Sequence, residues 1–289
     1  MTNCIHANRS RFRSSVGAIG IIAALLSAAG CAASSTSAGD RSARFDPDTG
    51  AIILPLDPYS IDGTPEGLAT IVAVHRLELR HRLADAGAAL PPLDVEELLR
   101  PVYDDDRRYG IWDANRTERF GYGKPASEVD EFDGVPESVR TECGSAALEA
   151  LADFGAAGDQ QPTIPQRLAE EAALDAERDP QWEVVKDRWR DCLREQGLTP
   201  PTGPNEWVSA EGVRVLMAKA GGEVSAEGIR IATIEATCNR DTGMAQEFAL
   251  IEAREQSVRI DANEAALAEE RLRIDDALAR ARERIAQLG

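Results

Sequence analysis

Adjacent acidic residues offer the first candidate chemistry in this 289-residue sequence. Asp104, Asp105 and Asp106 stand in the run YDDDRR, directly before Arg107 and Arg108. A hydrolase with paired carboxylates needs the two groups about 5–10 Å apart across a cleft. Adjacent acids on one turn point apart, so we interpret this run as a source of salt bridges with the two arginines. An exported hydrolase is therefore the least favoured function.

Aromatic side chains follow the acidic run, in a chain with only 5 % aromatic residues. One interpretation is a binding loop over residues 103–122, because flat rings stack on sugars and peptides. The other interpretation, which we favour, is that the rings anchor a long loop to the core. A concave pocket beneath Trp112 and Tyr122 would favour binding. The candidate loop residues are Tyr109, Trp112, Phe120 and Tyr122.

Other catalytic and metal-binding patterns are weak. His75 and His81 lie six positions apart on one predicted helix, about 240° around its axis, so they share neither a ligand nor a proton. Asp46 and Asp48 have the spacing that opens an EF-hand loop, but Asp57 stands in place of the bidentate glutamate. This segment is predicted to be a turn. Nucleophile-elbow and phosphate-binding glycine motifs do not occur, so we expect no enzyme, no metal and no cofactor.

The N-terminal residues have the pattern of a secretory signal. Three arginines precede an uncharged run over Val16–Leu26, and the small residues AAG lead to Cys31. This stretch resembles a bacterial lipoprotein signal whose lipobox reads Leu-small-small-Cys, with Ala28 in the leucine position. The resemblance implies cleavage after residue 30, lipid on Cys31 and a cell-membrane anchor with the remaining chain on the extracytoplasmic side. Residues 31–50 are small and polar and are predicted to form a flexible tether.

Two other interpretations of this segment stay open. An ordinary signal would be cleaved and the protein released, or Val16–Ala33 would remain as an uncleaved anchor, since 18 uncharged residues approach the usual span of about 17–25. All three place residues 40–289 outside the cytoplasm. Removal of residues 1–30 takes away three arginines and no acid, so the net charge falls from −18 to −21. Such a chain repels nucleic acid; the expected partners are the membrane, through the lipid, and a protein or cell-wall component.

Proline, glycine and serine divide residues 51–289 into predicted helices, with no strand pattern beyond residues 51–54. Thr64 before Pro65 is a typical helix start, and the repeated SAEG at Ser209 and Ser225 predicts two more. The fold class is therefore all-α, an elongated helical domain with a long C-terminal amphipathic helix. The other predicted helices cover 64–86, 136–154, 165–179 and 180–197.

The C-terminal run from Met244 to Leu288 contains no glycine and no proline. Apolar residues recur in it every seven positions, which predicts an amphipathic stripe. Docking on the same domain and dimerisation as a coiled coil remain equally open. The stripe consists of Ile260, Leu267, Ile274, Ala281 and Leu288.

Three cysteines follow the tether, so one internal disulfide and one unpaired thiol are expected in an oxidising compartment. Cys192 continues the helical face of Trp182, Val185 and Trp189, at spacings 3, 4 and 3, and Cys238 continues that of Ile231 and Ile234. Both therefore point into an apolar interior. These faces favour a Cys192–Cys238 bridge and leave Cys143 as the unpaired thiol.

Several short motifs support a family resemblance. The segments TGAIILPLDPY, DCLREQG and IEATCNRDTG resemble the LPLD-x-Y, Cys-Leu/Met-x-x-x-Gly and Ala-x-x-x-Cys motifs of uncharacterised exported lipoproteins of high-GC Gram-positive bacteria, over most of residues 47–288. The resemblance implies no reaction and no ligand. RDCLREQGLTPP also parallels RHRLADAGAALPP, with Arg82 where Cys192 stands, which suggests two related halves over about 51–155 and 162–289.

The function expected from these patterns is a membrane-anchored extracytoplasmic lipoprotein with a non-enzymatic, structural or partner-binding role. Contact would be made through the long terminal helix or the aromatic loop. The alternative is a module that binds cell-wall material or a small ligand through the loop 103–122.

Overall fold

The computed structural model describes residues 41–101, 106–123, 131–155, 162–218 and 224–289. The described residues are mostly helical, which confirms the predicted all-α class. A short hairpin of β1 (Arg44–Asp46) and β2 (Ala51–Ile53) accompanies the helices. The α-helices are α1 (Pro65–Asp85), α2 (Val95–Leu98), α3 (Ala114–Phe120), α4 (Glu137–Ala150), α5 (Ile164–Ala176), α6 (Pro180–Glu195), α7 (Ala210–Met217), α8 (Ala226–Thr242), α9 (Met244–Ala262) and α10 (Glu264–Leu288), and the 3-10 helices are η1 (Asp57–Tyr59) and η2 (Leu151–Phe154).

Local capping explains where several elements begin. The hydroxyl of Thr64 accepts the N–H of Gly67 at 3.1 Å and starts α1. Ser209 and Ser225 accept the N–H of the residue three positions on, each at 3.0 Å, and start α7 and α8. The three predicted starts are therefore confirmed. The predicted turn is present too, since Asp46 Oδ1 accepts the N–H of Asp48 at 2.9 Å within the hairpin.

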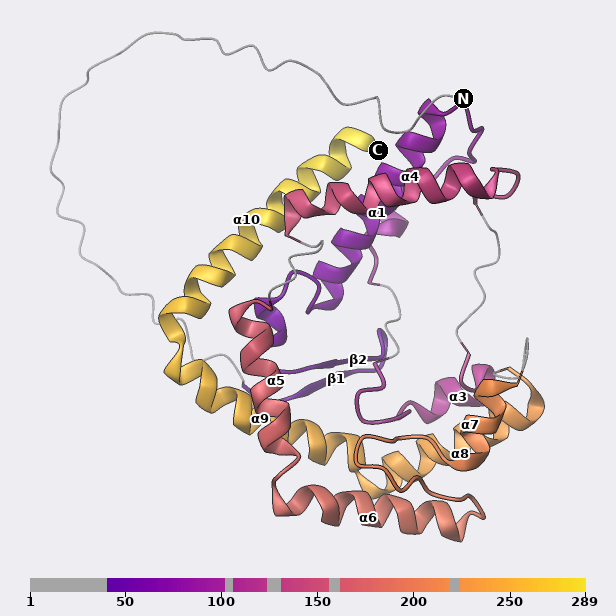
Figure 1. Ribbon diagram of the computed structural model, residues 1–289, viewed down its shortest axis with the longest axis vertical. Helices are drawn as coiled ribbons and strands as arrows, with labels where there is room; N and C mark the ends of the chain where they lie inside the picture. The colour runs from indigo at the N-terminus through magenta and orange to yellow at the C-terminus, as the bar shows by residue number, and fades with distance from the viewer. Residues whose placement is uncertain (1–40, 102–105, 124–130, 156–161, 219–223) are drawn as a thin grey trace, which may run out of the picture.

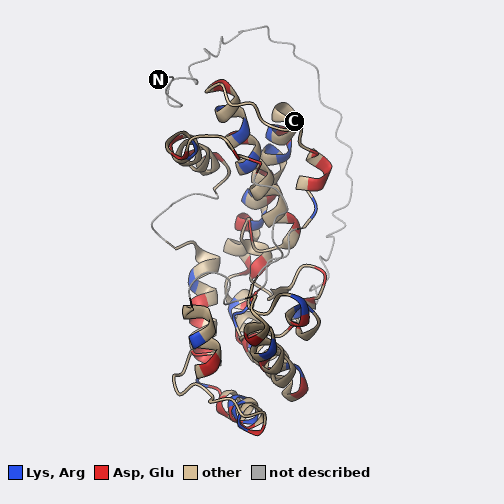
Figure 2. Ribbon diagram, turned by 90° about the vertical axis from the view of Figure 1, so that its right-hand side faces the viewer, with Lys and Arg blue, Asp and Glu red and all other residues tan. Residues whose placement is uncertain are grey.

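The helices form two groups along the length of an elongated molecule (Figure 1). The α1/α10 group contains α1, α2, α4, η2 and α10, with apolar clusters where α1 meets α10 and α4. The α8/α9 group contains the hairpin, α3 and α6–α9 around the main aromatic core. Figure 2 shows acidic and basic residues interspersed on helices of both groups. Each group takes elements from both of the expected halves, 51–155 and 162–289.

The C-terminal run is two helices. α9 lies in the α8/α9 group and α10 in the α1/α10 group, and the chain bends at Asn263, which has φ −127° and ψ 23°. The predicted stripe is covered by the same chain, because Ile274 and Ala281 are buried and α10 packs against α1. Of the two expected arrangements, docking on the own domain is the one found.

The predicted disulfide is confirmed. Cys192 of α6 and Cys238 of α8 are bonded, with their Cα atoms 5.7 Å apart. The tryptophans on the same face of α6 lie in the main core beside this bond, with Trp189 1 % exposed. The bond therefore ties two helices at the centre of the α8/α9 group.

Cys143 corrects the sequence interpretation. This residue is fully buried with Leu83 and Val135 in the cluster where α4 meets α1, and it is disulfide-bonded. The expectation of an unpaired thiol is therefore wrong, and the bonding partner lies outside the described residues. The expectation rested on counting only three thiols, after cleavage at residue 30 and lipidation of Cys31. Cys31 itself, with its predicted lipid, also lies outside the described residues.

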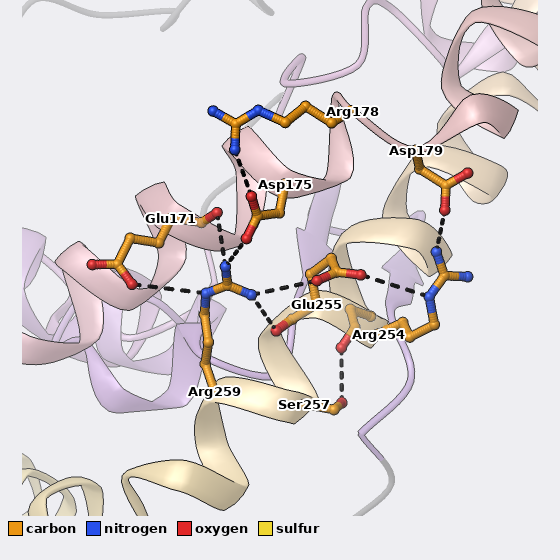
Figure 3. Close-up of polar contacts among 9 residues, drawn as sticks. Glu171, Asp175, Arg178, Asp179, Arg254, Glu255, Ser257 and Arg259 are labelled. Atoms are coloured by element: carbon orange, nitrogen blue, oxygen red, sulfur yellow. Dashed lines mark hydrogen bonds and ion pairs between the residues drawn. The ribbon is translucent and has the colours of Figure 1, made fainter.

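Ion pairs fasten α5 along α9 (Figure 3). The guanidinium of Arg259 contacts the Glu171 carbonyl oxygen at 3.1 Å and the Asp175 carboxylate. One turn earlier, Arg254 pairs with Asp179 just after α5. The hydrogen bond from the Arg259 guanidinium lowers the pKa of Asp175 against the opposing effect of burial, and Arg178 lowers it further. Pairs of this exposed kind each contribute little, so we assign them a role in positioning α5 and no chemistry.

Candidate functional site

Tyr109, the first of the four aromatic residues proposed for the binding loop, lies in the core. Its side chain is 3 % exposed, and its hydroxyl donates a hydrogen bond to Glu252 Oε2 at 2.5 Å. The ring meets those of Trp182 at 6.1 Å and Phe248 at 5.8 Å. Tyr109 therefore anchors the loop, as the favoured interpretation of these aromatics predicted.

Trp112 and Phe120 also have structural partners. The indole N–H of Trp112 donates to the Asp106 carbonyl at 2.9 Å, and its ring meets Phe45 of β1 edge-on at 5.2 Å. The guanidinium of Arg119 lies 5.1 Å from the Phe120 ring centre. Neither aromatic ring belongs to the pocket described below. Trp112 therefore holds the loop against the hairpin, whereas the ring of Phe120 lies against an arginine of its own helix.

The acidic run supplies one described residue, Asp106, since Asp104 and Asp105 lie outside the described residues. Arg108 Nε donates to Asp106 Oδ2 at 2.8 Å, the local pairing expected from the sequence. Arg108 also faces Asp57, whose Oδ2 accepts the Leu54 N–H at 2.7 Å. Burial raises the pKa of Asp57 to about 6, against the opposing effect of Arg108.

A buried polar chain links this region to α9. Glu252 accepts hydrogen bonds from Tyr109 and from Gln256 Nε2, and Gln256 Oε1 accepts the Leu56 N–H at 2.8 Å. Burial raises the pKa of Glu252, while the Tyr109 hydroxyl and Arg108 favour its ionised form. These side chains join the segment after the hairpin to the core, and none of them lines the pocket. The arrangement is therefore structural.

A pocket of about 720 Å³ opens between the segment 107–122 and the loop that connects α6 to α7. Tyr122 is the predicted binding-loop residue that lines it. Its other walls are mostly apolar and come from a Gly- and Pro-rich connection that the sequence interpretation treated only as a loop. The lining residues most relevant to binding are Arg107, Tyr122, Pro200, Pro201, Trp207 and Val213.

Trp207 is the outer member of the aromatic core. Its ring centre lies 5.4 Å from Phe248 and 6.4 Å from Trp182, and the half-buried indole also lines the pocket. Lys186 of α6 places its ammonium nitrogen 4.4 Å from the Trp207 ring centre, a cation–π contact. The core thus supports Trp207 as a pocket wall.

Lys186 also holds the loop beside Trp207. Its side chain is 0 % exposed, and Nζ donates to the Gly203 carbonyl at 2.9 Å and to the Pro204 carbonyl. Burial lowers the pKa of Lys186. The described contacts of its ammonium are therefore two carbonyls of the α6–α7 loop and the aromatic face of Trp207, which lines the pocket. The sequence places Lys186 on the same helical face as Trp182 and Trp189, but nothing in that pattern predicted its contacts with the loop and Trp207.

Two glutamates hold the same loop, one near its start and one at its middle. Glu211 accepts the Thr199 N–H at 2.7 Å, and Glu206 accepts the Gly203 N–H at 2.8 Å. The N–H of Thr199 is the main reason why the pKa of Glu211 is lowered. Side chains thus give the loop the hydrogen bonds that regular structure would otherwise supply. The pocket wall is preformed.

Glu235 lies beneath the opposite wall, at the start of α7. Its Oε1 accepts the Ser209 N–H at 2.8 Å, and burial raises its pKa while hydroxyls of Ser209 and Tyr122 oppose the rise. Gly212 makes this close packing possible: a Cβ there would lie 2.3 Å from the Tyr122 hydroxyl oxygen and 2.8 Å from Glu235 Oε1. Tyr122 is thereby fixed with its hydroxyl under α7.

A second cavity, of about 560 Å³, lies between η1, η2 and α10. Its wall is polar, and four of its charged residues form pairs along α10, Arg273 with Glu270 and Arg280 with Asp276. Within the described ranges, His, Cys, Asp and Glu side chains form no grouping suited to a metal ion. In the same ranges, each helix is too short or too polar to cross a membrane. The apolar pocket is therefore the stronger candidate site.

Comparisons with protein-family models, with characterised proteins and with solved structures find no match to this chain.

Proposed function

We propose that this protein is exported to the cell envelope and binds a small molecule without transforming it. Lipid on Cys31 remains a separate prediction from the sequence pattern, because a mature chain that begins at a lipidated Cys31 would keep no further cysteine to bond with Cys143. The observation that carries the binding role is the pocket of about 720 Å³ between the segment 107–122 and the α6–α7 loop. Small-molecule sites typically enclose about 300–1,000 Å³ and have apolar and aromatic walls with few polar groups. The lining by Trp207 and Tyr122 fits that description.

Contact with a protein partner through the terminal helix has less support. The stripe of α10 that would make such a contact is buried against α1. The aromatic loop offers little free surface for a partner either, because Tyr109 and Trp112 are occupied by contacts within the chain. The pocket is the feature that these arguments leave for binding.

A matched pair of substitutions tests the binding role. The full chain in detergent micelles is titrated with the neutral probe N-phenyl-1-naphthylamine, and the emission sensitised by tryptophan is recorded against empty micelles. Val213 on α7 lines the pocket and is 38 % exposed, whereas Val258 on α9 is 62 % exposed and does not line it. Val213→Phe fills part of the pocket and should weaken binding about tenfold, or about 1.4 kcal/mol.

Val258→Phe adds the same volume elsewhere and should leave the affinity unchanged. If the unsubstituted chain binds no probe, or if Val213→Phe binds it as tightly as the parent, the proposed binding role is wrong.

Intact mass of the membrane-extracted protein tests the anchor. The predicted anchor requires a chain that begins at Cys31 and carries the added mass of acyl chains. Reduction adds about 2 Da per disulfide, so a lipidated chain that begins at Cys31 should gain about 2 Da from the Cys192–Cys238 bond. A gain of about 4 Da would include a bond at Cys143, which needs a cysteine from residues 1–31, and would contradict this anchor. A mass without lipid would contradict the anchor and leave the pocket untouched.

A further inference from the structure

The charges around the pocket restrict what can enter it. Among the described lining residues, Arg107 and Glu206 are the charged ones. Arg107 Nη2 donates to the Tyr122 carbonyl at 2.7 Å, and Glu206 Oε2 accepts the Gly203 N–H at 2.8 Å. Both side chains thus already serve the pocket wall. A charged ligand group would lose its water and meet one wall charge of each sign, so attraction to one is offset by repulsion from the other and burial of the charge is costly.

The shape of the aromatic wall adds a second restriction. Two side chains support Trp207 from within the protein. The Lys186 ammonium nitrogen lies 4.4 Å from the Trp207 ring centre, and the Phe248 ring centre lies 5.4 Å from it. The part of the indole that lines the pocket is therefore a rigidly supported flat surface. Aromatic rings gain more than their buried area alone when they stack or meet edge to face.

We propose that the part of the ligand that enters this pocket is uncharged, apolar and ring-bearing, and that it packs against Trp207. This inference rests on the proposed binding function and names its ligand class. A sugar phosphate, an amino acid or another charged metabolite would be rejected by the same pocket. The polar groups at its edge, such as Thr202 and Asn205, remain able to bind hydroxyl or carbonyl groups at the outer end of the ligand.

Two probes that differ by one charge test the ligand class. N-phenyl-1-naphthylamine is neutral, and 8-anilino-1-naphthalenesulfonate carries the same rings with a sulfonate added. The full chain is titrated with each at about 1 M salt, where the Debye length is about 3 Å, so that repulsion by the net charge of −18 is screened. We expect the neutral probe to bind about tenfold or more tightly than the anionic one.

A charge placed in the wall should change this preference. Val213→Lys adds a cation to the pocket, and Val258→Lys adds the same charge on α9 away from it. The first substitution should shift the affinity ratio about tenfold toward the sulfonate, as expected for a nearby unlike charge, and the second should leave the ratio unchanged.

The outcomes separate the two proposals. Equal or tighter binding of the sulfonate by the parent chain overturns the ligand class and leaves the binding function standing. An unchanged ratio in Val213→Lys also overturns the ligand class, because the probes then report another site. If the parent chain binds neither probe, the proposed function itself fails.

Discussion

Replacing Lys186 by methionine removes a charge that holds the α6–α7 loop and faces Trp207, a residue of the pocket wall. The ammonium donates to the carbonyls of Gly203 and Pro204 and faces Trp207, while its aliphatic stem packs in the core. Methionine keeps most of that stem. The substitution therefore isolates the contribution of the charge to the loop.

The magnitude follows from opposing contributions. Hydrogen bonds from a charged donor contribute about 1.5–3 kcal/mol each, and a cation–π contact contributes about 0.5–2 kcal/mol. Against them stands the cost of keeping an ammonium group at a site that is 0 % exposed, a cost that methionine relieves. Pro204 is exposed, so its carbonyl recovers a hydrogen bond from water. We expect a net loss of about 1–2 kcal/mol in the free energy of unfolding.

The effect on binding should be larger than stability alone predicts. Without Lys186 the loop keeps its hydrogen bonds to Glu206 and Glu211. It loses the cation–π contact that helps to position Trp207 in the pocket wall. We expect the affinity for N-phenyl-1-naphthylamine to fall about tenfold, and the tryptophan emission to shift to longer wavelength as the indole becomes more exposed.

Urea unfolding and probe titration measure the two effects on the same samples. Val184→Met is the control, because Val184 lies on the same helix and is 53 % exposed. The reasoning is refuted if Lys186→Met has the affinity, the emission and the unfolding midpoint of the parent chain. The contacts of Lys186 with the loop and Trp207 would then contribute neither to stability nor to binding.

Three further predictions concern stability. Gly212→Ala should cost about 1–3 kcal/mol in thermal unfolding, because its Cβ would lie 2.3 Å from the Tyr122 hydroxyl oxygen, whereas Gly144→Ala on α4, with no atom within 4 Å, should be neutral or stabilising; equal effects would contradict the clash. Burial raises the pKa of Asp57 to about 6, so its protonation stabilises the fold, and this contribution is lost as pH rises from about 4 through about 6; Asp57→Asn should flatten that part of the curve of Tm against pH, and an unaltered slope would refute the assignment. Opening the bond at Cys192 by substitution with serine should cost about 4 kcal/mol, the chain-entropy value for a loop of 46 residues, measured by urea unfolding; a loss below about 1 kcal/mol would show that the unfolded chain gains little from release.

Local signals in the sequence predicted much of the fold. The caps at Thr64, Ser209 and Ser225 act within one helical turn, so the residues themselves specify them. The face shared by Trp182, Trp189 and Cys192 also follows from the helical period, and it led to the correct bond with Cys238. These are short-range rules.

Features that depend on distant partners escaped the same reasoning. The bend at Asn263 has no glycine or proline to announce it, and it follows from α9 and α10 packing in different groups. Trp207 and Lys186 belong to one site only because the α6–α7 loop folds back over α6. Among the four loop aromatics proposed for binding, Tyr122 is the one that lines the pocket, since Tyr109 and Trp112 found partners in and around the core and Phe120 lies against Arg119 of its own helix.

The packing of α10 on α1 sets an order of events for folding. Arg284 near the end of the chain contacts Glu78, 206 positions earlier, at 2.6 Å, and the apolar side of α1 is covered by Ile285 and Ala281. Contacts over such separations close late, because the intervening chain must first be brought together. The apolar side of α1 is therefore covered only after α10 has been made. A chain that extends only to α9 leaves the apolar cluster of the α1/α10 group incomplete and exposed to solvent. Loss of the final helix would expose that group to aggregation. The pocket would keep all of its lining residues, because the helices α6 and α7, whose connecting loop lines it, lie at the other end of the molecule (Figure 1).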